Sequence, residues 1–124
     1  MSSGMQVIQP HDPHRFLRLA DELGDGSSDE TRLRTAVGRA YYGLFLLARA
    51  KTGAYSPTDS HRAVIDALKK TSGMQAVAGQ LDRMRRLRTV ADYEMVPINP
   101  RHQDWVKNWV TCKALYRNIL PHMM

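Results

Sequence analysis

The chain has 124 residues, of which 43% are hydrophobic and 24% are charged, a composition typical of one folded domain and not of a disordered chain. Its single cysteine excludes an internal disulfide and favours a cytoplasmic location. The most apolar stretch, residues 40–48, is too short to cross a bilayer, and no export signal is recognisable, so we expect no membrane partner. The formal net charge of +6 favours contact with a polyanion.

Short sequence signals predict where helices begin. A capping residue precedes proline at residues 12–13, 56–57 and 99–100, and proline suits the first helical position because its missing N–H needs no partner there. Ser27 and Glu30 have the spacing of a capping box. We therefore expect a helix to begin at each of these places.

Glycines predict where the helices end, because glycine readily takes the left-handed conformation that closes many helices. We expect the first helix to end before residues 24–26, the second at Gly53 and the third near Gly73. A fourth helix is predicted from about residue 74 to residue 93.

Apolar residues recur at helical spacing along the predicted helices. In the first helix they are Phe16, Leu19, Ala20 and Leu23. In the second they are Leu33, Ala36, Val37, Ala40, Tyr41, Leu44, Leu47 and Ala48. In the last they are Trp105, Trp109, Cys112, Tyr116 and Ile119.

No segment has the alternating pattern of a strand, so we predict an all-α fold. Short connections favour antiparallel neighbours, which indicates an up-and-down helical bundle of four to five helices. We expect residues 1–124 to form this single domain, with a flexible N-terminal segment at 1–11 and a tail at 121–124.

The second helix has more apolar surface than one stripe requires. A second patch is predicted at Tyr42, Phe45, Leu46 and Arg49. It is interpreted either as a homodimer interface or as a surface that the first or last helix covers, and the sequence leaves both open.

The stretch "RMRRLRTVADYEM", residues 83–95, concentrates arginine on the fourth helix. A projection at about 100° per residue directs Arg83 and Arg86 to solvent and places Arg88 near the centre of the apolar stripe. Arg85 and Asp92 fall at the edge of that stripe. The run is therefore predicted to contain two groups of arginines, one facing solvent and one facing the core or its edge.

A guanidinium directed at apolar surroundings needs acceptors or a wet cleft, because burying it unpaired is costly. We predict that Arg88 lies in a cleft or at a dimer seam, with Asp92 as acceptor and Tyr93 as a phenol. The alternative interpretation is an ion pair between Arg88 and Asp92 that only orders the bundle.

Two stretches together resemble the HEPN domains, named for higher eukaryotes and prokaryotes nucleotide-binding. The stretch "RTAVGRAYYGLFLLARA" is similar to the family pattern Arg-x-Ala-x-x-Arg-Ala-Tyr-Tyr-x-x-Phe, and "LRTVADYEM" is similar to its Leu-Arg-x-x-Ala-Asp-Tyr segment. The intervening "SHRAVIDAL" agrees with it, and the resemblance spans about residues 12–120.

This resemblance implies a bundle that is commonly dimeric and associated with RNA, nucleotides or a separate small nucleotidyltransferase partner. Some members are metal-independent ribonucleases or toxins whose site pairs an arginine with a nearby downstream histidine. Here no histidine stands among residues 91–95, so the arginine is kept and the base is missing.

We therefore expect a non-catalytic or weakly catalytic module that binds RNA, a nucleotide or a nucleotidyltransferase partner. Its predicted nucleic-acid contacts are Arg83, Arg85, Arg86 and Arg88. One alternative is a metal-independent endoribonuclease of a toxin–antitoxin pair, with Arg88, Asp92 and Tyr93 as candidate catalytic residues. Another is a purely structural assembly protein.

The remaining candidate ligands are interpreted as structural residues. His11 and His14 have a spacing that metals use, but no second pair accompanies them, and His61, His102 and His122 are isolated in sequence. We expect no metal and no cofactor, and we expect Cys112 to be buried.

Overall fold

The computed structural model describes residues 10–124, and within that range the chain forms helices and no strand. The elements in order are α1 (His14–Gly24), α2 (Glu30–Thr52), α3 (Ser60–Lys69), α4 (Gln75–Tyr93), the 3-10 helix η1 (Pro100–His102) and α5 (Trp105–Met123). The all-α prediction is confirmed. Most of the flexible segment predicted at 1–11 lies outside the described residues.

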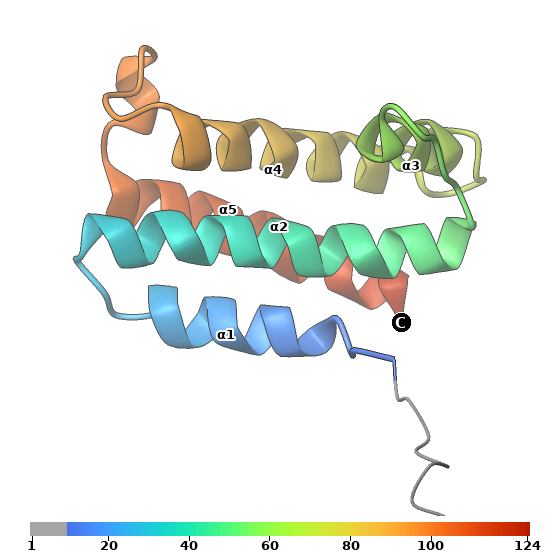
Figure 1. Ribbon diagram of the computed structural model, residues 1–124, viewed down its shortest axis with the longest axis horizontal. Coiled ribbons are helices and arrows are strands. Elements are labelled where there is room, and N and C mark those ends of the chain that lie inside the picture. The colour runs from blue at the N-terminus through green and yellow to red at the C-terminus, as the bar shows by residue number, and fades with distance from the viewer. Residues whose placement is uncertain (1–9) are drawn as a thin grey trace, which may run out of the picture.

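The helix α2 lies at the centre of the bundle (Figure 1). It packs against α1, α4 and α5, and the short α3 bridges one end of α2 and α4. Successive long helices run in opposite directions, so the bundle is up-and-down as the short connections predict. The loop after α4 and η1 projects at the end of the bundle opposite α3.

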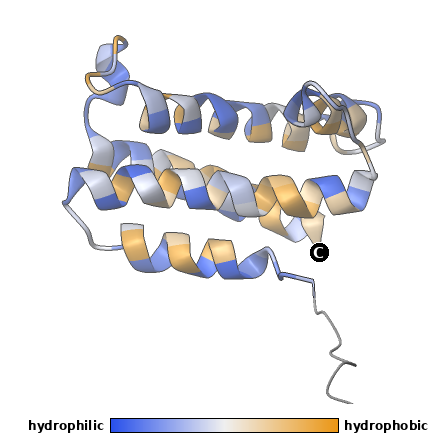
Figure 2. Cartoon of the chain, viewed as in Figure 1, coloured by the Kyte–Doolittle hydropathy of each residue, from blue (hydrophilic) through white to orange (hydrophobic). Residues whose placement is uncertain are grey.

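One continuous core holds the helices together. Each helix carries hydrophobic residues on some sides and hydrophilic residues on others (Figure 2), as burial of one face requires. The stripe predicted for α5 is buried throughout, and that of α2 is buried except at Leu47, which is half-buried. The stripe predicted for α1 is partly wrong, because Leu17 is buried and Leu19 is 40% exposed.

The start predicted at residues 12–13 is confirmed to within one residue, because α1 begins at His14, whereas α2, α3 and α5 begin a few residues later than predicted. Carboxylates close to the predicted positions do the capping: Asp29 accepts from Arg32 N, Asp59 from Arg62 N and Asp104 from Lys107 N. The Asn99–Pro100 pair begins only η1, and Ser56 stabilises a turn before α3. Aspartate suits these positions because its charged side chain accepts the capping bond and also interacts favourably with the helix dipole.

The end of the chain also differs from expectation. Residues 121–123 continue α5 and are not a tail, and Met123 is buried against the core. The predicted end of α2 is confirmed, since Gly53 takes a φ of 66° and its N–H bonds to the carbonyl of Arg49 at 2.8 Å.

A polar clamp fastens α1 to α5. Lys113 Nζ bonds to Asp21 Oδ1 at 2.6 Å and to Asp25 Oδ2 at 2.9 Å. Trp109 Nε1 donates to Asp25 at 3.0 Å. Since the Lys113 side chain is only 15% exposed, these bonds satisfy a charge that is largely removed from water.

Close packing at the same contact depends on glycine. A Cβ at Gly24 would lie 2.4 Å from the Trp109 ring, whereas a Cβ at Gly79 in α4 would meet nothing within 4 Å. We predict that Gly24→Ala lowers the free energy of unfolding by about 1–3 kcal/mol through overpacking. Gly79→Ala is expected to be neutral or to stabilise by up to about 1 kcal/mol, because alanine favours a helix.

Chemical unfolding of the two variants beside the parent protein measures both effects. Equal stability of the Gly24 and Gly79 variants would contradict the close contact between α1 and Trp109.

Candidate functional site

The arginine-rich face of α4 divides as the sequence predicts, but its buried stripe is rotated. Leu87 and Val90 are buried beside the predicted residues, so Arg88 lies at the edge of the core and not at its centre. Its side chain is 31% exposed. Arg83 and Arg86 are exposed on the other side of the helix, as predicted.

The predicted cleft of Arg88, Asp92 and Tyr93 is only partly assembled. Arg88 Nε pairs with Asp92 Oδ2 at 3.0 Å within α4. Tyr93 is 72% exposed and lines a shallow hollow with Asp92 and Arg34, which Arg88 does not line. The geometry therefore agrees with the intrahelical ion pair that the sequence left open.

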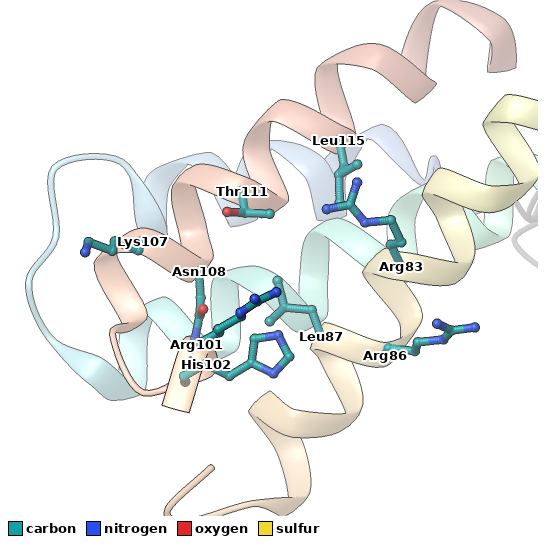
Figure 3. A pocket seen from close by; sticks show the side chains of 9 residues that line it. All are labelled: Arg83, Arg86, Leu87, Arg101, His102, Lys107, Asn108, Thr111 and Leu115. Atoms are coloured by element: carbon teal, nitrogen blue, oxygen red, sulfur yellow. Dashed lines mark hydrogen bonds between the residues drawn. The ribbon is translucent and has the colours of Figure 1, made fainter. Parts of the chain in front are cut away.

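A different hollow, between α4, η1 and α5, gathers the exposed arginines (Figure 3). It has a volume of about 440 Å³. The lining residues are Arg83, Arg86, Leu87, Arg101, His102, Lys107, Asn108, Thr111 and Leu115. We call this hollow the basic groove. Its lining has four permanently cationic side chains and no carboxylate.

The cations surround a partly apolar floor. Leu87 and Leu115, both about nine-tenths buried or more, form that floor from facing helices. Figure 3 shows Arg83 and Arg101 directed into the space between α4 and α5 from two sides, while Lys107 points outward from the edge. The groove can therefore place several positive charges around one anionic chain.

Nearby carboxylates neutralise only part of this charge. Arg86 pairs with Asp82 at 2.7 Å, yet the Arg86 side chain remains 73% exposed. Asp104 is engaged as the cap of α5 through Lys107 N. Within residues 10–124, Arg83 and Arg101 form no ion pair, so their charges are available to a ligand.

The wall of the groove formed by η1 is held by side-chain to backbone bonds. Asn108, only 4% exposed, donates from Nδ2 to the carbonyl of His102 at 2.9 Å. Gln103 Nε2 donates to the carbonyl of Pro97 at 3.0 Å. Asn99 caps η1 by accepting from Arg101 N. These bonds position Arg101 opposite α4.

The end of α4 is held in turn by Arg34 of α2. Its guanidinium donates to the carbonyls of Ala91, Glu94 and Met95 at 2.8–3.0 Å and lies 4.4 Å above the Trp105 ring. These carbonyls lie where α4 ends, and no N–H of a following helical turn donates to them. The donors of the arginine satisfy them instead. In the sequence, Arg34 stands out only as the first residue of the stretch that resembles HEPN domains.

A second polar cluster lies on the other side of α4. His61 Nδ1 is hydrogen-bonded to the hydroxyl of Tyr41 at 2.6 Å, and the His61 ring stacks on Phe45 with centroids 4.1 Å apart. Burial, and then the positive charge of Arg88, lower the pKa of His61. Asp59 opposes them less strongly, and Arg85 and Arg49 contribute smaller lowering effects. His61 is isolated in sequence, and only the packing of α3 onto α2 brings it to these arginines.

The apolar patch predicted on α2 is smaller than expected. Phe45 is 3% exposed because it stacks against His61 and Tyr41 inside the monomer, so its assignment to an open interface is wrong. Tyr42, Leu46 and Arg49 do line an open hollow, together with His11, Pro13, Phe16 and Ala50. Homodimer formation there stays a prediction.

No family profile, curated protein or solved structure matches this chain. The HEPN assignment therefore remains a resemblance. Among residues 10–124 no cluster of histidine, cysteine and carboxylate side chains suited to a metal is present, and no helix there is long and apolar enough to span a membrane.

The environment of His61 predicts a pH-dependent stability. The pKa of His61 in the folded protein lies below the ordinary value of 6.5. Above pH 6.5 the ring is neutral in both the folded and the unfolded chain, and its contribution to stability is fully present. As the pH falls from 6.5 toward the folded pKa, the unfolded chain binds the proton first, so this contribution is lost. We expect the parent protein to lose more unfolding free energy between about pH 7.5 and about pH 5 than His61→Phe does.

Urea unfolding at the two pH values measures this difference. Phenylalanine keeps a ring beside Phe45 but cannot bind a proton, so identical pH dependence in both proteins would show that His61 does not contribute.

Proposed function

We propose that this protein is a non-catalytic module that binds single-stranded RNA through the basic groove. The observation that carries the proposal is a groove lined by Arg83, Arg86, Arg101 and Lys107 and by no carboxylate, with Arg83 and Arg101 pointing into it. Clustered Lys and Arg release counterions from phosphates on binding, which makes such a surface attractive to nucleic acid.

The shape of the groove supports an RNA strand over a single small anion. A volume of about 440 Å³ with an apolar floor at Leu87 and Leu115 accommodates a base or ribose, while Arg83 and Arg101 contact phosphates. The choice of RNA among polyanions rests on the resemblance to HEPN domains. The same resemblance supports a homodimer and a small nucleotidyltransferase partner, both of which we retain as proposals.

This proposal changes the set of binding residues expected from the sequence. Arg83 and Arg86 are retained, and Arg101 and Lys107 join them from segments that follow α4. Arg85 and Arg88 are not part of the groove lining, because they lie on the side of α4 that approaches Tyr41 and His61.

We predict that RNA affinity falls as the salt concentration rises. The double variant Arg83→Ala, Arg101→Ala should reduce the magnitude of the slope of log affinity against log salt by about 1.4, because each lost phosphate contact contributes about 0.7 for a single strand. Fluorescence anisotropy with a labelled single-stranded RNA, titrated at several salt concentrations, measures the slope.

The matched control is Arg15→Ala with Arg62→Ala, which removes the same charge from exposed sites outside the groove. If the control variant reduces the slope equally, RNA binding depends on the net charge of the protein and not on the basic groove.

One observation favours a second candidate, metal-independent RNA cleavage. His61 can take the place of the missing base of the sequence motif, because burial, and then the positive charge of Arg88, lower the pKa of its ring. A neutral histidine can accept the 2′-hydroxyl proton, and an arginine can stabilise the charge that develops on phosphate.

The two candidates differ in one assay. Incubating labelled RNA with the protein and EDTA is expected to leave the RNA intact if the module only binds. EDTA-resistant cleavage that disappears in both His61→Ala and Arg88→Ala, with unfolding midpoints close to the parent value, would replace binding by ribonuclease activity.

A further inference from the structure

We propose that the loop after α4, together with the cations beside it, binds the surface of an anionic lipid bilayer. The loop comprises residues 94–99 and stands at the same end of the molecule as the basic groove. This inference goes beyond RNA binding and departs from the expectation of no membrane partner, which rested on the lack of a spanning segment.

The loop presents large apolar side chains to water. Met95 is 93% exposed, Val96 is 76% exposed and Ile98 is 88% exposed, and Tyr93 just before them is 72% exposed. Single exposed apolar residues are ordinary on protein surfaces, but four within six positions form a concentrated apolar tip. Tyrosine is also a residue favoured at the boundary between lipid and water.

The exposure is built into an ordered loop. Arg34 donates to the carbonyls of Glu94 and Met95, and Ile98 N donates to Glu94 Oε1 at 3.0 Å. Pro97 is buried and its carbonyl accepts from the Gln103 amide. These bonds hold the backbone so that Met95, Val96 and Ile98 point away from the core, and a tip that is already ordered loses little entropy on insertion.

Positive charge follows the apolar tip directly. Arg101 comes three positions after Ile98, and Arg83, Arg86 and Lys107 line the same groove. Three carboxylates, Glu30, Asp92 and Glu94, also line a hollow with Tyr93 and Met95 of the tip. Glu30 pairs with Arg34 and Asp92 with Arg88, whereas Glu94 accepts a bond from Ile98 N and keeps its negative charge. Apolar side chains beside basic ones are the combination that binds anionic lipid headgroups and the acyl boundary at once.

Other occupants explain less of this surface. RNA would engage the cations and the ring of Tyr93, but the aliphatic side chains of Met95, Val96 and Ile98 offer no ring on which bases stack. A second copy covering the tip would bring two basic grooves together, each on a chain of net charge +6. A lipid surface matches both the apolar tip and the charge.

Vesicle co-sedimentation tests the proposal. We expect the full chain to bind vesicles of phosphatidylcholine containing about 30% phosphatidylglycerol and to show little binding to pure phosphatidylcholine. Met95→Ser with Ile98→Ser is expected to lower the partition onto anionic vesicles at least about fivefold, because insertion of apolar groups is lost without any change in charge.

Matched variants separate the contributions. Tyr55→Ser with Val110→Ser removes two apolar side chains that are 73% and 63% exposed outside the loop, and vesicle binding should be unchanged. Arg83→Ala with Arg101→Ala should weaken binding to anionic vesicles, whereas the Met95 and Ile98 pair should bind RNA like the parent chain. The last result keeps failure of the lipid proposal distinct from failure of RNA binding.

Three outcomes would overturn the proposal. They are absence of binding to anionic vesicles, equal binding to both vesicle types, and unchanged vesicle binding after the Met95 and Ile98 substitutions. A loss of self-association in that loop variant, measured by sedimentation without any vesicle binding, would assign the tip to a second copy of the chain instead.

Discussion

The guanidinium of Arg34 joins the central helix α2 to the end of α4, and the loop that follows α4 depends on it. Its side chain is 15% exposed, and it combines bonds to carbonyls of α4 and the loop, an ion pair with Glu30 at 3.0 Å and a stacked position over Trp105. Planar geometry with several donors makes arginine suited to this role, which a lysine would not reproduce. This anchor holds the start of the loop, and Asn108 and Gln103 hold η1 beyond it.

The helix α4 separates its charges by direction. Arg83 and Arg86 extend toward α5 and solvent, whereas Arg85 and Arg88 extend toward the Tyr41 and His61 pair. Asp82 pairs with both sides, at 2.7 Å from Arg86 and 3.4 Å from Arg85, and Asp92 pairs with Arg88 on the second side. On the first side, Arg83 has no ion pair among the described residues, and the neighbouring elements add further cations. The same short run therefore forms one face whose arginines are ion-paired and another face on which positive charge is left without a paired carboxylate.

Function is proposed at the open face, where an apolar tip and a basic groove adjoin. RNA and an anionic bilayer share the phosphate chemistry that arginine and lysine bind, so one groove can contact either polyanion. Met95, Val96 and Ile98 of the apolar tip distinguish them, since these aliphatic side chains contribute to lipid contact and offer no ring for base stacking. The opposite face of α4 has a different chemical character, because Tyr41 holds His61 there, and burial, followed by the positive charge of Arg88, lowers the pKa of the His61 ring.

Periodicity determined most of the fold without tertiary information. The stripes of α2 and α5, the glycine that ends α2 and the extent of α4 were predictable because each depends on local conformation and on residues one turn apart. The helix starts were displaced to Asp29, Asp59 and Asp104, since several neighbouring residues could cap and only the final geometry selects one.

The candidate sites were decided by tertiary structure. Arg83 and Arg86 were identified from the sequence as outward-facing, but nothing in the sequence places Arg101 and Lys107 beside them, because that proximity requires α4, η1 and α5 to pack. The same holds for His61, which lies 20 positions from its hydrogen-bond partner Tyr41. A sequence specifies which face of a helix is apolar, whereas the contacts between polar residues of different helices depend on how those faces dock in three dimensions.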